Sequence, residues 1–164
     1  MGFAGQRVIA VSLGGYHSLA LTADGAVWSW GYGYTGLLGH GDDEHQLMPK
    51  KVEAFMGQRV IAVSAGGSHS LALTADGAVW SWGWGFQGML GHGYTQHQQL
   101  PKKVEAFADQ RVVAVSAGER HSLALAADGA VFAWGKGDGG RLGHGEDDSS
   151  QLLPKKINAC IIDH

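Results

Sequence analysis

Histidine is the side chain of this sequence best suited to chemistry, because imidazole can bind a metal ion or move a proton near neutral pH. Six of the nine histidines recur every 52 residues, three before a serine and three inside Leu-Gly-His-Gly: His17, His69, His121, His40, His92 and His144. Zinc ligands must converge on one small sphere, and none of these histidines has a cysteine partner or a His-x-x-x-His spacing. We expect them to hydrogen-bond the backbone of turns, with an axial metal site and a surface contact as alternatives. No metal and no cofactor is expected.

Serine follows the first three of these histidines, at Ser18, Ser70 and Ser122. Adjacent residues of a strand point to opposite faces, so each serine cannot form a nucleophilic pair with the histidine beside it. The Gly31-x-Gly33 and Gly83-x-Gly85 segments lack a following helix and a Gly-Lys-Ser/Thr motif, which indicates turns rather than phosphate loops. We therefore expect no catalytic residue and no enzyme activity.

Three near-identical copies of one 52-residue unit position these side chains. Each copy opens on Gln-Arg-Val, at 6–8, 58–60 and 110–112. The predicted units are residues 1–57, 58–109 and 110–164, together one partial domain. A period near fifty residues built from short strands indicates a propeller or another repeat array.

The middle copy predicts four strands. Residues 60–65 form a β-branched run that ends at glycine, and residues 71–82 form two apolar stretches around Asp76-Gly77, a pair suited to a tight hairpin turn. Residues 101–107 are predicted to form the fourth strand, with Pro101 at the edge. Four antiparallel strands per unit make one blade of an all-β propeller. Trp80 and Trp82 share a parity, so we expect both to pack between blades.

Composition narrows the class of protein. Hydrophobic residues make up 45% of the chain and charged residues 16%, without a continuous membrane-spanning run or a signal peptide. The single cysteine, Cys160, cannot form an internal disulfide, which favours a reducing compartment and a cytoplasmic or nuclear location. The net charge of −3 argues against nucleic acid as the main partner.

The motifs of the middle unit resemble the regulator of chromosome condensation repeat family in order and spacing: Gly67-Ser68-His69-Ser70-Leu71-Ala72-Leu73, Asp76-Gly77, Val79-Trp80-Ser81-Trp82-Gly83 and Gly88-Met89-Leu90-Gly91-His92-Gly93. The resemblance runs through all three units. It implies a propeller of the seven-bladed type. Members of that family include an exchange factor for the Ran GTPase, a plant UV-B photoreceptor and domains of giant ubiquitin ligases, so the resemblance leaves function open. The photoreceptor's Gly-Trp-Arg-His-Thr motif is absent, because Gly15, Gly67 and Glu119 stand where its tryptophan would be.

Three blades are fewer than the roughly four to eight of a closed propeller, and an open arc would expose apolar faces at both ends. Either the sequence is a fragment or copies associate. Phe3 and Cys160 both fall at the repeat phase of Phe55, which would suit head-to-tail joining of two chains into a six-bladed homodimer.

The copies differ mainly in two loops, and rigid frames commonly display binding residues on such loops. Tyr32, Tyr34, Thr35 and Leu37 of the first copy correspond to Trp84, Phe86, Gln87 and Met89 of the second. A later loop differs as well, with Asp42, Asp43 and Glu44 against Tyr94, Thr95 and Gln96. The alternative is neutral drift. The candidate partner-binding residues are Tyr32, Tyr34, Trp84, Phe86, Lys136 and Arg141.

The leading functional hypothesis is a non-enzymatic protein-interaction module, with a small GTPase or a ubiquitin-pathway component as the protein partner. One alternative is a guanine-nucleotide exchange factor, or part of one, for a Ran-like GTPase. Related exchange factors use a wedge-like insertion, whereas all three units here keep nearly one length. Another alternative is a symmetric self-assembling propeller fragment, natural or designed.

Overall fold

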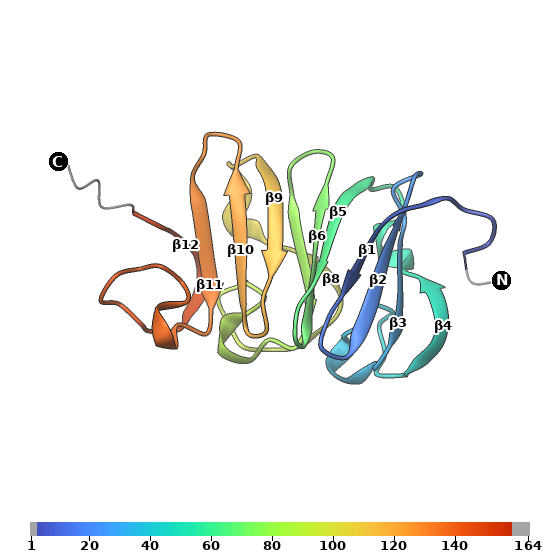
Figure 1. The fold of residues 1–164 in the computed structure, drawn as a ribbon, viewed down its shortest axis with the longest axis horizontal. Helices are drawn as coiled ribbons and strands as arrows, with labels where there is room; N and C mark the ends of the chain where they lie inside the picture. Colours follow the sequence, from blue (N-terminus) through green and yellow to red (C-terminus); the bar gives the residue numbers. More distant parts are fainter. Residues whose placement is uncertain (1–2, 159–164) are drawn as a thin grey trace.

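Three four-stranded antiparallel sheets stand side by side in an open arc in the computed structural model, which describes residues 3–158 (Figure 1). The first sheet contains β1 (Val8–Leu13), β2 (His17–Thr22), β3 (Val27–Gly31) and β4 (Gln46–Lys51). The second contains β5 (Val60–Ala65), β6 (His69–Thr74), β7 (Val79–Gly83) and β8 (Gln98–Lys103). The third contains β9 (Val112–Ala117), β10 (His121–Ala126), β11 (Val131–Gly135) and β12 (Gln151–Lys156).

The strand order within each sheet follows the sequence, so each repeat builds one blade. This confirms the predicted all-β, propeller-type fold of three blades. Cys160, on which the reducing-compartment and repeat-phase arguments depended, lies outside the described residues.

The Asp-Gly pairs make the predicted hairpin turns. Gly77, between β6 and β7, has a φ of +86°, which is a left-handed conformation that glycine adopts without strain. Its amide donates to the Thr74 carbonyl over 2.9 Å. The Asp76 carboxylate accepts the Thr74 hydroxyl at 2.5 Å. The turn therefore fixes the register of the two central strands of its blade.

The fourth strand differs from its predicted bounds. It begins at Gln98 rather than Pro101 and ends at Lys103, and residues Glu105–Phe107 form a 3-10 turn, η4. The chain leaves the sheet there because the ring of Phe107 turns onto the next blade. The register of β8 on β7 shifts between Ser81 and Gly83, and Pro101 falls at that irregularity, where its missing N–H costs no ladder bond.

The hydrophobic core lies between the sheets. Phe55 contacts Trp80 and Trp82 with ring centroids 5.6 Å apart in both pairs, which confirms that these two tryptophans face the same side. Phe107 contacts Phe132 and Trp134 in the same way at 5.2 and 5.5 Å. Each pair of neighbouring blades thus encloses one core.

A glycine on the loop of each of the first two blades allows close approach to the outer strand of the next blade. A Cβ atom on Gly36 would lie 2.2 Å from Cα of Gln99, and one on Gly88 would lie 2.5 Å from Cα of Leu152. Such distances exclude any side chain, so the blades lock at this contact.

The helical segments of the described residues are turns of three residues. None of them has the length and apolar character that crossing a membrane requires.

Candidate protein-interaction surface

Two sets of connections meet along one edge of the arc, called the loop rim here. It consists of the turns before β2, β6 and β10 and the loops before β4, β8 and β12, at the lower edge of Figure 1. Backbone hydrogen bonds hold each turn to its loop: Tyr32 N donates to Tyr16 O at 3.0 Å, and Trp84 N to Ser68 O at 2.9 Å. The Asp-Gly hairpins lie at the opposite edge.

The first blade presents a group of aromatic rings on the loop rim. Tyr32 stacks on His45 with centroids 4.5 Å apart and meets Tyr34 edge-on at 4.8 Å. Tyr16 lies 5.7 Å from Tyr32. The three tyrosines are 44 to 62% exposed. Nδ1 of His45 accepts the Gly33 amide at 2.9 Å and so fixes the ring against which Tyr32 stacks.

The second blade repeats the group with different rings. Trp84 stacks on Phe86 at 5.3 Å, and His97 lies 6.4 Å from Trp84. Nδ1 of His97 accepts the Gly85 amide at 3.0 Å. Phe86 is 48% exposed, and Trp84 is half-buried. The same scaffold therefore displays two different aromatic pairs.

An apolar hollow joins the two blades. It has a volume of ≈ 220 Å³ and is lined by Tyr16, Tyr32, Tyr34, Thr35, Leu37, Ser68 and Trp84. A second hollow of ≈ 290 Å³ shares Tyr16, Ser68 and Trp84 and continues to Glu119 and Arg120 of the third blade. Tyr32, Tyr34 and Trp84 are thereby brought to one place, and Phe86 joins them through its stacking on Trp84.

The sequence interpretation did not select Tyr16, His45 and His97. A signal for the two histidines was present, since each lies 12 residues after the second glycine of a Gly-x-Gly segment. Tyr16 gave no such signal, because only the β1–β2 turn brings it beside Tyr32.

The third blade contributes charge instead of aromatic rings. Lys136 and Arg141 both pair with Asp138, at 3.6 and 3.7 Å. Lys136 N donates to Arg120 O at 2.9 Å, which places its loop on the same rim. Neither cation lines the apolar hollow, so these two predicted residues are separate from the aromatic group.

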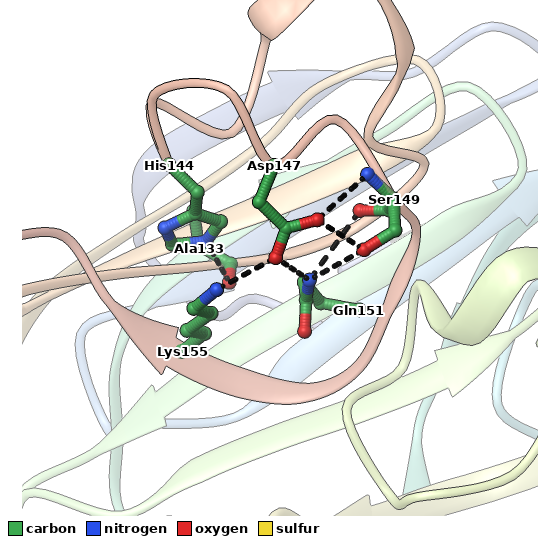
Figure 2. A network of polar contacts seen from close by, with 6 residues as sticks. All are labelled: Ala133, His144, Asp147, Ser149, Gln151 and Lys155. Carbon is green, nitrogen blue, oxygen red and sulfur yellow. Dashed lines mark hydrogen bonds and ion pairs between the residues drawn. The ribbon is translucent and has the colours of Figure 1, made fainter.

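The outer loop of the third blade is held by its own polar network (Figure 2). The Asp147 carboxylate accepts Nζ of Lys155 at 2.8 Å and the Ser149 amide at 3.1 Å. These donors, Lys155 first, hold the pKa of Asp147 well below its ordinary value. His144 contacts the Ala133 carbonyl at 3.5 Å in the same view.

Two of the three histidines before serine, His17 and His69, bond a side chain of the next blade, which corrects the expectation that they bond turn backbone. Nε2 of His17 lies 2.7 Å from Oγ of Ser70, and Nε2 of His69 lies 2.9 Å from Oγ of Ser122. Adjacent strand residues face opposite ways, so Ser70 and Ser122 reach the histidine of the preceding blade rather than the histidine beside them. We call these two pairs, with the cores beside them, the seam.

The histidine–serine pairs of the seam are buried, which indicates a structural role. Ser70, Ser122 and His69 are fully buried, and His17 is 4% exposed. Desolvation lowers the pKa of His17 to about 4 and that of His69 to about 3, so both imidazoles are neutral near pH 7. A solvent-borne substrate has no access to a pair buried in this way.

The Leu-Gly-His-Gly histidines also bond a serine, here within one blade. Nε2 of His40 lies 3.0 Å from Oγ of Ser29, and Nε2 of His92 lies 2.9 Å from Oγ of Ser81. In the third blade alanine replaces this serine, and His144 has the long carbonyl contact instead. Among residues 3–158, no group of three histidine, cysteine, aspartate or glutamate side chains is placed to hold a metal ion.

The chain matches known proteins over nearly all of its length. The family model described as the RCC1-like domain covers residues 2–163. The chain is 48% identical over 146 residues to the human E3 ubiquitin-protein ligase HERC2, covering 88% of this chain and 3% of that protein. It is 40% identical over 159 residues to the Arabidopsis thaliana ultraviolet-B receptor UVR8, covering 97% of this chain and 36% of the receptor.

Solved structures share the fold. Human WBSCR16 superposes with a TM-score of 0.83 at 29% identity, over 95% of this chain and 41% of that one. Prp20p of Saccharomyces cerevisiae superposes with a TM-score of 0.77 at 31% identity, over 92% of this chain and 38% of that one.

The chain spans less than half the length of each of these relatives. Three blades with the repeat motifs in register, the matching family model and the superposed structures give one conclusion. The chain belongs to the RCC1-like domain family.

Proposed function

We propose that this chain is a non-enzymatic protein-interaction module that binds a protein partner through the aromatic part of the loop rim. The observation that carries the proposal is the apolar hollow shared by the first two blades, lined by Tyr16, Tyr32, Tyr34 and Trp84. Large rings left exposed beside a hollow supply contact area at little conformational cost, and tyrosine and tryptophan are enriched among the residues that dominate binding energy.

Contacts within the loop rim hold its aromatic side chains in place before a partner binds. Tyr32 and Trp84 are each stacked on a neighbouring ring and bonded through their own amide to the adjacent turn. Side chains held in this way lose little freedom when a partner binds, and affinity improves accordingly. Arg120, at the edge of the second hollow, would add a charged contact on the side of the third blade.

Two relatives favour a protein as the partner class. HERC2 is named as an E3 ubiquitin-protein ligase, and the Prp20p study concerns its binding to Gsp1p and histones. By analogy we propose a small GTPase or a ubiquitin-pathway component for this chain. The analogy concerns the class of partner only, since function resides in the site and not in the fold.

The test selects binders from a displayed random-peptide library against the immobilised chain. Selected peptides are then compared on the wild type and on a variant carrying Trp84→Ala and Phe86→Ala. We expect the double change to weaken binding at least tenfold, because it removes one wall of the hollow and the ring that supports it. Met56→Ala is the matched control, since Met56 is 82% exposed and lies in the connection between β4 and β5, off the loop rim.

Peptides that bind the double variant as tightly as the wild type would refute the proposed surface. The same conclusion would follow if Met56→Ala weakened binding as much as the double change. Circular dichroism of each variant separates loss of binding from loss of fold.

Nucleotide exchange on a small GTPase is a second candidate, favoured by the similarity to Prp20p. The three repeats of this sequence have nearly equal length, so none of these three repeats contains a wedge-like insertion that could open a nucleotide site. Release of labelled GDP from Gsp1p, with and without the chain, tests this candidate. Stimulated release would promote exchange over simple binding, and an unchanged rate would remove it.

A further inference from the structure

The apolar hollow of the loop rim adjoins a larger hollow between the same two blades, called the outer hollow here. The outer hollow has a volume of ≈ 440 Å³, and its lining includes Thr35, Asp43, His97 and Gln99. Thr35 lines both hollows, and the ring of His97 lies 6.4 Å from that of Trp84 in the apolar hollow. The two hollows together form one groove between the first and second blades, called the inter-blade groove here.

The two ends of the inter-blade groove differ in charge. The apolar hollow is lined by aromatic rings and has no charged side chain in its lining. The outer hollow contains the carboxylate of Asp43, and neither lysine nor arginine lines it. The hollow on the side of the third blade is different again, because Glu119 and Arg120 of opposite charge both line it. A single uncompensated sign therefore occurs only at the Asp43 end among these three hollows.

The fold holds the Asp43 carboxylate in place. Its Oδ1 accepts the Gly36 amide at 3.0 Å and Nε2 of Gln99, on the second blade, at 3.1 Å. Within residues 3–158, Asp43 forms no ion pair and its Oδ2 accepts no hydrogen bond. The outer end of the groove thus carries a fixed anion with one oxygen that a further donor can reach.

The third blade shows how a cation occupies this position. Asp147 stands where Asp43 does, since each is the second residue after a Gly-His-Gly segment. Nζ of Lys155 on β12 lies 2.8 Å from the Asp147 carboxylate (Figure 2). Lys50 is the corresponding lysine of β4, paired with β3 in the same register, but it forms no ion pair among the residues that the structure describes. The contact that one blade completes by itself is open in the other.

The residue between the two hollows has a strained backbone. Thr35 has a φ of +59° and a ψ of +22°, a left-handed conformation that is unusual for a β-branched residue. Gln87 of the second copy shares this conformation without the branch, and the third copy has Gly139, which adopts it freely. A strained side chain that lines both hollows supports a binding role for the groove.

We propose that the inter-blade groove binds an extended protein segment that carries a large apolar side chain and, a few residues away, a lysine or arginine. The apolar side chain enters the apolar hollow, and the cation pairs with Asp43 as Lys155 pairs with Asp147. This inference rests on the proposed function, because the apolar end of the groove is the surface proposed above. The Asp43 carboxylate repels an acidic segment and thereby selects among partners.

The peptides selected from the displayed library test the inference. We expect them to be enriched in lysine or arginine close to an aromatic or aliphatic residue. Asp43→Asn keeps the size of the side chain and an oxygen for the Gly36 amide, but it removes the charge. Fluorescence polarisation should show binding weakened about threefold to fivefold by this change, as for an exposed ion pair. Glu44→Gln is the matched control, because it removes one charge from the same loop outside the groove, and it should weaken binding less than about 1.5-fold.

A double-mutant cycle assigns the contact. Replacing the cation of a selected peptide by alanine should weaken its binding to the wild type and leave its binding to Asp43→Asn unchanged. Peptides that need Trp84 and Phe86 but bind Asp43→Asn as tightly as the wild type would overturn this inference and leave the proposed function standing. An equal effect of Glu44→Gln would also overturn it, because the effect would then come from the overall charge of the loop. Peptides that need neither Trp84 nor Phe86 would instead refute the proposed function itself.

Discussion

The seam between the blades and the loop rim belong to the same repeat, yet they differ in how strongly the repeat fixes their side chains. His17 and His69 occupy one position of the repeat and make one kind of bond to the next blade. Tyr32, Trp84 and Lys136 also occupy one position, but they are three different chemical types. Burial explains the difference, because a change in the seam leaves a void or an unpaired polar group, whereas a rim side chain faces water.

The largest effect should come from the apolar part of the seam. Trp82 is fully buried between the first two blades, so Trp82→Ala is expected to lower the free energy of unfolding by about 3–5 kcal/mol. Urea denaturation followed by circular dichroism measures it. The control is Trp30→Ala, at the equivalent place on the half-buried face of the first blade. Equal losses from the two changes would mean that stacking between blades does not stabilise the seam.

The polar part of the seam should contribute less to the free energy of unfolding than the apolar part. Ser122→Ala leaves Nε2 of His69 buried without its partner and is expected to cost about 1–3 kcal/mol of unfolding free energy. Ser68→Ala, on the half-buried loop rim, should change stability by less than about 0.5 kcal/mol. If Ser122→Ala and Ser68→Ala change the free energy of unfolding equally in urea denaturation, the bond between His69 and Ser122 does not stabilise the fold.

Stability should depend on pH through the two seam histidines and through His92, whose pKa burial also lowers to about 4. Burial lowers the pKa of His17 to about 4 and of His69 to about 3, against 6.5 in the unfolded chain. Because the unfolded state binds protons first, stability is complete above pH 6.5 and decreases as the pH falls toward 4. The slope is up to about 1.4 kcal/mol per pH unit for each histidine.

Chemical denaturation at several pH values gives this slope. His69→Gln removes one titrating group while keeping a polar side chain, so its stability should depend less steeply on pH between 6.5 and 4. A variant that keeps the full wild-type slope would assign the pH dependence to other groups.

The smallest expected effect is an increase in stability. Ala133 replaces the serine that bonds His40 and His92 in the other blades, and His144 is left with a contact of 3.5 Å. Ala133→Ser should restore the bond and raise the free energy of unfolding by about 0.5–1 kcal/mol. Thermal unfolding compared with the wild type detects it. A loss of stability would show that the buried site of Ala133 has no room for the hydroxyl.

The sequence predicted the elements that short-range patterns encode. Alternation and the Asp-Gly turns located the central hairpin of each blade, and the parity of Trp80 and Trp82 indicated their common face. The partners of the histidines were missed because a bond over 53 residues depends on how blades stack. The end of β8 was missed because residues 104–107 are as apolar as a strand, although Phe107 is needed between blades. The four aromatic candidates, Tyr32, Tyr34, Trp84 and Phe86, lie on the loop rim, as expected for residues predicted to lie in loops. Tyr16 could not be predicted, because only the fold places it beside the hollow.

We infer that the loop rim recognises a partner while the seam stabilises the fold. The most direct test measures unfolding free energy and binding to the selected peptides on the same samples of Trp84→Ala and Phe86→Ala. We expect each variant to keep its free energy of unfolding to within about 1 kcal/mol of the wild type and to lose most of its binding. Variants that lose stability as Trp82→Ala does, or that bind like the wild type, would contradict it.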